Sequence, residues 1–139
     1  MQHVQNRSTT SALVLTAVLI ALATLFTMYT KIPVPGIRGY FNVGDVVIMT
    51  SALLLGRKYG AYIGAIGPAL ADLFLGYAVF VPITFVVKGI EGYLVGTVYN
   101  NKTTTSALVA TVVGGIIIVA GYFIAEYFVF DPGVAIASI

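Results

Sequence analysis

Two ionisable residues, Lys88 and Glu91, lie near the middle of a strongly apolar segment, residues 82–96. An ionisable side chain at the centre of a bilayer costs at least ~2.5–3.5 kcal/mol on insertion scales, so such residues usually face a bundle interior, a partner charge or a water-filled cavity. On a helix, Lys88 and Glu91 share a face with Thr84, and their spacing permits an i,i+3 ion pair. A structural ion pair and a binding site for a polar solute are both consistent with this pattern.

Two further carboxylates occur in apolar surroundings. Asp72 lies on a small-residue face of segment 60–76, and Lys88 is its predicted partner by depth. Glu126 shares a helical face with Tyr122 near the end of the last apolar run, where it can either contact water or line a site.

The residue types that most enzymes need are scarce. Cysteine is absent, and the single histidine, His3, lies in the polar N-terminal segment. Thiolate chemistry is therefore excluded, and metal ligation by histidine is not expected. Without a Ser–base pair either, we expect neither an enzyme nor a cofactor.

The composition is that of a membrane protein, with 59% hydrophobic and 9% charged residues. Soluble domains carry about 25% charged residues. The apolar residues come in long runs and not in the short alternating segments of a transmembrane barrel, so we predict an all-α, polytopic helical bundle in a lipid bilayer. The net charge of +2 comes from basic residues scattered at helix ends, which indicates topology determinants and not a nucleic-acid surface.

The apolar runs predict five transmembrane helices in a single domain spanning residues 1–139. Their expected bounds are about 12–30, 43–57, 60–76, 82–99 and 106–130, and residues 134–139 resemble the start of a further element. The beginning of the first run could alone pass for a secretory signal. Its full length of ~18–20 residues favours an uncleaved spanning helix.

Small residues and turn residues indicate how these helices pack and connect. Ala17 and Ala21 in the first helix form a small-xxx-small pair, and Gly60 and Gly64 form a GxxxG pair that predicts close helix–helix contact. Asn42 can cap the second helix, whose first turn contains Asp45. Residues 31–42, rich in Pro and Gly, form a predicted loop that is either a lid over a site or a solvated connector.

The basic residues predict the orientation. Alternation of five spans places Arg7, Arg57, Lys58 and Lys102 on one side, and Lys31 and Arg38 on the other. By the positive-inside rule the first side, with the N-terminus, is cytoplasmic in the plasma membrane. Polar residues in the outer half of the bundle then predict a small-molecule pocket open to the outside.

Residues 39–77, GYFNVGDVVIMTSALLLGRKYGAYIGAIGPALADLFLGY, are followed by PITFVVKGIEGYLVG at 82–96. With its GYFN-x-GD opening, ALADL-x-LGY and KG-x-EG motifs, this sequence resembles the substrate-binding S component of energy-coupling factor (ECF) vitamin transporters. The similarity runs from about Ser11 to Gly96 and continues more weakly to Phe130.

The resemblance implies a six-helix fold, here lacking the last helix, that binds a vitamin-like ligand and associates with a membrane T component and two cytoplasmic ATPases. Ala17 and Ala21 match the family's AxxxA contact with the T component. Family ligands lie between the outer loops and the outer halves of the last three helices. That region contains the implied substrate-binding residues Arg38, Tyr40, Asn42, Tyr77, Thr84, Lys88, Tyr122 and Glu126.

The expected function is capture of a vitamin or vitamin precursor from outside the cell. The chain has no GxxxxGK[ST] phosphate-binding motif, so ATP hydrolysis would be carried out by partner subunits. The alternative is a self-contained ion-coupled carrier or channel that uses Asp72, Lys88 and Glu91 as an intramembrane relay.

Overall fold

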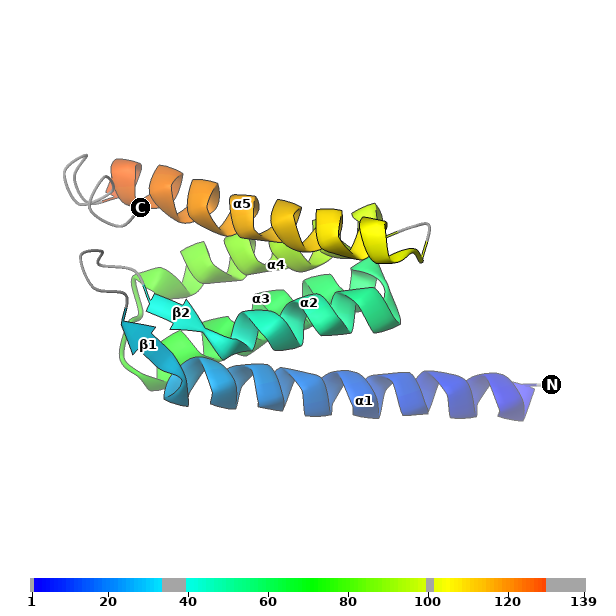
Figure 1. Ribbon diagram of the computed structural model, residues 1–139. Coiled ribbons are helices and arrows are strands. Elements are labelled where there is room, and N and C mark those ends of the chain that lie inside the picture. Colours follow the sequence, from blue (N-terminus) through cyan, green and yellow to red (C-terminus); the bar gives the residue numbers. More distant parts are fainter. Residues whose placement is uncertain (1, 34–39, 100–101, 130–139) are drawn as a thin grey trace.

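The computed structural model describes residues 2–33, 40–99 and 102–129, over which the chain forms a helical bundle (Figure 1). Its elements are α1 (Gln2–Tyr29), β1 (Lys31–Pro33), β2 (Tyr40–Asn42), α2 (Val43–Leu55), α3 (Arg57–Phe74), α4 (Phe80–Val98) and α5 (Thr104–Val129). Within these described ranges, three segments are long and apolar enough to cross a membrane: Thr9–Tyr29, Phe80–Val98 and Thr104–Ala125. The predicted fold class, a helical membrane bundle, is confirmed.

The helices lie side by side, with α1 along one edge of the bundle, α5 along the other, and α2, α3 and α4 between them (Figure 1). The strands β1 and β2 form an antiparallel pair at the end where α3 turns into α4, which we call the hairpin end. The α2–α3 turn and the α4–α5 connection lie at the opposite end, which we call the basic end because it carries Arg57, Lys58 and Lys102.

Some elements differ from the sequence-based expectation. α1 begins at Gln2 and not near residue 12, because residues 2–11 are polar but contain neither Gly nor Pro to interrupt a helix. α3 begins at Arg57 and not at Gly60. The predicted loop over 31–42 contains the pairing of Lys31 with Asn42 and of Pro33 with Tyr40. The expected start of a further element at 134–139 lies outside the described residues.

α3 and α4 are held together by glycines whose missing side chains allow the backbones to touch. A Cβ added to Gly92 would overlap the carbonyl oxygen of Gly60, and one added to Gly64 would overlap that of Lys88. No side chain fits in such a space, so these contacts fix how far α3 and α4 are displaced along each other. The close contact predicted from the GxxxG pair is confirmed.

The start of α2 is also fixed locally. Asn42 has extended backbone angles, and its side chain accepts a 2.7 Å hydrogen bond from the amide of Gly44, which is the geometry of a helix N-cap. Asp45 follows in the first turn, near the positive end of the helix dipole. The predicted cap is confirmed, and it fixes where α2 begins.

Candidate functional site

Lys88 of α4 lies at the centre of a buried polar region. Its side chain is 6% exposed, and its Nζ atom donates a hydrogen bond to Oδ1 of Asp45 from α2. The same Nζ atom lies 3.2 Å from Oε2 of Glu91, so the i,i+3 ion pair predicted from the sequence is confirmed. One ammonium group is therefore shared by two carboxylates from two helices.

Thr84 lies one turn before Lys88 on the same face of α4 and connects two other helices. Its hydroxyl donates to Oδ2 of Asp72 from α3 at 2.5 Å and lies 2.9 Å from the hydroxyl of Tyr122 from α5. A threonine hydroxyl has one hydrogen, which Asp72 accepts, so Tyr122 is the donor in the second bond. The Nζ atom of Lys88 lies 5.8 Å from the ring centroid of Tyr122, within cation–π range.

These side chains come from four helices and form one group, which we call the polar cluster. Its members are Asp45, Asp72, Thr84, Lys88, Glu91 and Tyr122. The polar cluster offers an ammonium group, hydroxyl groups, carboxylates and an aromatic face. This inventory suits recognition of a polar or aromatic solute.

The predicted pairing of Asp72 with Lys88 is wrong. Because α3 and α4 run antiparallel with Gly64 against the backbone of Lys88, the backbone of Asp72 lies farther toward the hairpin end than that of Lys88 does. The Asp72 carboxylate therefore accepts a hydrogen bond from Thr84, which lies one turn closer to the start of α4 than Lys88 does. The continuous Asp72–Lys88–Glu91 relay is therefore not formed.

Asp45 is the partner that sequence reasoning missed. Its place in the first turn of α2 predicted only a favourable interaction with the helix dipole. The helical spacing indicated this role, because Ile48 and Ala52 follow Asp45 by three and seven residues and therefore share its face of α2. Both are fully buried, so this is the inner face of the helix. A carboxylate on that face was a candidate counter-ion for the buried lysine.

The other predicted substrate-binding residues lie nearer the hairpin end or outside the described part. The side chain of Asn42 is buried and occupied as the N-cap of α2. Tyr77 is half exposed in the turn between α3 and α4, edge-on to Phe80 with 6.5 Å between ring centroids. The backbone of Tyr40 belongs to β2. The structure does not describe Arg38, nor the side chains of Tyr40 and Glu126.

The predicted partner-interface residues are on the outside of α1. Ala17 and Ala21 are exposed, whereas the neighbouring Thr16, Ala23 and Thr24 are buried against the bundle. The hydroxyl of Thr24 shares its one hydrogen between the carbonyl of Ile20 in α1 at 2.8 Å and that of Gly67 in α3 at 3.0 Å, so this inner face of α1 contacts α3. The small-residue pair thus points away from the helices described.

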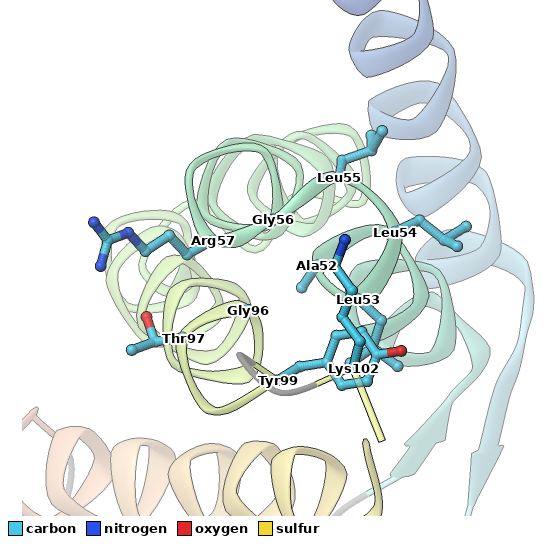
Figure 2. A pocket seen from close by; sticks show the side chains of 10 residues that line it. All are labelled: Ala52, Leu53, Leu54, Leu55, Gly56, Arg57, Gly96, Thr97, Tyr99 and Lys102. Carbon is cyan, nitrogen blue, oxygen red and sulfur yellow. The ribbon is translucent and has the colours of Figure 1, made fainter. Parts of the chain in front are cut away.

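A hollow of about 500 Å³ lies at the basic end, between the turns that join α2 to α3 and α4 to α5 (Figure 2). Its lining includes Leu53, Gly56, Gly96, Tyr99 and Lys102. None of the predicted substrate-binding side chains that the structure describes lines this hollow. Within the described ranges, no group of three or more His, Cys, Asp or Glu side chains is placed to hold a metal ion.

Comparison with known proteins decides the family. Residues 7–139 match the family described as ECF-type riboflavin transporter, S component. The chain belongs to this family. The resemblance seen in the GYFN-x-GD, ALADL-x-LGY and KG-x-EG motifs is thereby confirmed, and the S component is a membrane protein.

Two relatives extend this comparison. The S component is 43% identical over 118 residues to an uncharacterised protein of Pyrococcus woesei, covering 83% of this chain and 78% of that protein. It is 32% identical over 126 residues to the thiamine precursor transporter HmpT of Lactococcus lactis subsp. cremoris, covering 89% of this chain and 69% of the relative.

Proposed function

We propose that this S component captures a small, flat heteroaromatic vitamin or vitamin precursor from outside the cell, for ATP-driven uptake by partner subunits. The family description names riboflavin, and the Lactococcus relative is named a transporter of a thiamine precursor. Both solutes contain heteroaromatic rings. The observation that carries the proposal is the joining of buried Thr84 and Lys88 with partly buried Tyr122 into one group between α4 and α5.

The chemistry of this group matches such a solute. A heteroaromatic ring needs an aromatic partner for stacking and a few directed hydrogen bonds to its carbonyl and nitrogen atoms. Tyr122 supplies an aromatic ring beside the hydroxyl of Thr84. The ammonium group of Lys88 has three donors, and Asp45 accepts one of them, so an acceptor atom of the ligand can bind another.

The site opens outward in this proposal. Arg57, Lys58 and Lys102 gather at the basic end, which the positive-inside rule assigns to the cytoplasm together with the N-terminus. The polar cluster lies toward the hairpin end, and Thr84 belongs to the outer half of α4. Residues 31–42 would then cover the ligand, with Arg38, Tyr40, Asn42, Tyr77 and Glu126 as the further proposed contacts.

Partner subunits would supply the energy. We assign contact with the T component to the exposed pair Ala17 and Ala21, because small residues on a lipid-facing helix allow another helix to approach closely. Two cytoplasmic ATPases complete the proposed complex.

Titration of the purified S component with riboflavin and with an aminopyrimidine precursor of thiamine tests the proposal. We expect saturable binding of one of them. Thr84→Val should lower the affinity about tenfold or more, because the ligand atom that binds Thr84 would be buried without a partner, which costs ~1–3 kcal/mol. The matched control is Thr97→Val, since Thr97 is an exposed threonine of α4 whose hydroxyl bonds to the backbone of its own helix. Equal losses in both variants would place the ligand elsewhere.

Co-purification from native membranes under mild detergent tests the transport part. ATPase subunits should accompany the tagged S component and should be lost with Ala17→Leu together with Ala21→Leu. Solute uptake by the S component alone, in ATP-free vesicles driven by an ion gradient, would instead establish the ion-coupled carrier.

A further inference from the structure

Glu91 is the most deeply buried charged residue of the polar cluster. Its side chain has no exposed surface, and both of its carboxyl oxygens are shielded from solvent. Neither oxygen accepts a hydrogen bond from any residue in the described part of the chain. The 3.2 Å approach of Lys88 to Oε2 is thus a charge contact without hydrogen-bond geometry.

The charges around Glu91 do not balance if every carboxylate is ionised. Lys88 is a single positive charge, and Asp45 competes with Glu91 for it. Asp45 accepts the hydrogen bond from Lys88 and keeps 21% of its side chain exposed, so it is both better paired and better hydrated. When two carboxylates share one site, the less solvated one is the less favourable anion.

Groups from the neighbouring helices do not correct the imbalance. α3 contributes Asp72, another carboxylate, which accepts a hydrogen bond from Thr84. α5 contributes the phenol of Tyr122 and the glycine surface at Gly114, where an added Cβ would lie 3.7 Å from Cγ of Glu91. α2 contributes Asp45. Among the described residues, Lys88 is the sole cation within ion-pair distance of Glu91. An isolated buried carboxylate carries an effective desolvation cost of several kcal/mol, which a bound proton removes.

We propose that Glu91 is a proton-binding site, neutral in the folded S component at neutral pH, while Asp45 is the ionised partner of Lys88. The Lys88–Asp45 pair is then electrically neutral, and Glu91 adds a protonated carboxyl beside it. The proposal concerns the ligand-free bundle and does not depend on the identity of the transported solute.

Infrared difference spectroscopy on the full chain tests this directly. The wild-type protein at neutral pH should show the carbonyl band of a protonated carboxylic acid, shifted by exchange into heavy water. Glu91→Gln should abolish the band, and the control Asp72→Asn should keep it. Absence of the band in the wild type, or its loss in Asp72→Asn with retention in Glu91→Gln, overturns the proposal. Should Glu91→Gln not fold, Glu91→Asp keeps a carboxyl group and should move the band.

The pH dependence of unfolding provides a second measurement. In the unfolded chain Glu91 is exposed to water and ionised at neutral pH, so unfolding would release the proton. The folded state then binds one more proton than the unfolded state, and the unfolding equilibrium constant rises by up to tenfold for each unit of increasing pH. Glu91→Gln should remove this dependence and be at least as stable as the wild type at neutral pH. If Glu91→Gln keeps the wild-type pH dependence of unfolding and is less stable at every pH, Glu91 is ionised in the folded protein.

Discussion

The two halves of α4 are packed by different means. Toward the basic end, Gly92 and Gly96 press against the backbone of α3, where a Cβ at Gly96 would lie 2.5 Å from Arg57 backbone atoms. Toward the hairpin end, the side chains of Thr84 and Lys88 make polar contacts with side chains from α2, α3 and α5, although the backbone of Lys88 also touches Gly64 of α3. The half toward the basic end is fitted mainly through backbone surfaces, and the half toward the hairpin end mainly through a few polar atoms.

Under the proposed function, this difference separates the part of the bundle that sets geometry from the part that would respond to a ligand. The glycine contacts leave no room for rearrangement, because backbone atoms of two helices already touch. The polar cluster depends on which donor meets which acceptor, and the proposed ligand would exchange with those partners. Glu91 lies at the boundary between the two halves, since it belongs to the polar cluster and is followed directly by Gly92.

The largest effect is expected from Lys88→Met, which breaks the polar half. Removing the ammonium group leaves Asp45 without its partner, and loss of one member of a buried pair costs ~3–5 kcal/mol. Unfolding in mixed micelles of increasing denaturing detergent, followed by circular dichroism, measures the change.

A second substitution separates the loss of pairing from the loss of packing. Adding Asp45→Leu to Lys88→Met should recover part of the stability, because the uncompensated carboxylate is gone. Asp45→Asn alone should cost less than Lys88→Met, since Glu91 can ionise and replace Asp45 as the partner of Lys88. If the double variant is less stable than Lys88→Met, the pair is not what stabilises this half.

A smaller effect is expected from Gly92→Ala, which disturbs the glycine half. The new Cβ would overlap the carbonyl oxygen of Gly60, so α3 and α4 must separate, and overpacking of this kind costs ~1–3 kcal/mol. Gly115→Ala is the matched control, because nothing lies within 4 Å of its added Cβ. The same detergent titration should show Gly115→Ala as stable as the wild type or slightly more so. Similar losses in both variants would contradict the tight contact.

The fold could be predicted largely from local patterns. Apolar runs indicated the helices, Asn42 indicated the start of α2, and the Gly60–Gly64 pair indicated a close contact. The start of α1 could not be predicted in this way, because hydropathy indicates where a helix enters lipid and not where its hydrogen bonding begins.

The site was predictable only where it depends on one helix. The Lys88–Glu91 pair follows from i,i+3 spacing within α4. The pairing of Lys88 with Asp45, and of Thr84 with Asp72, depends on how far neighbouring helices are displaced along each other. Glycine contacts between backbones set that displacement, and a single sequence shows which residues are small but not which partner each one meets.

The smallest effect, and the one that best separates binding from packing, is expected from Tyr122→Phe. This change removes the hydroxyl that bonds to Thr84 but keeps the ring near Lys88, so stability should fall by only ~0.5–1.5 kcal/mol. Tyr127→Phe is the control on the same helix, because Tyr127 is 47% exposed. Ligand titration should show weaker binding for Tyr122→Phe alone. Equal affinity in both variants would leave the Tyr122 hydroxyl a packing group and confine recognition to Thr84 and Lys88.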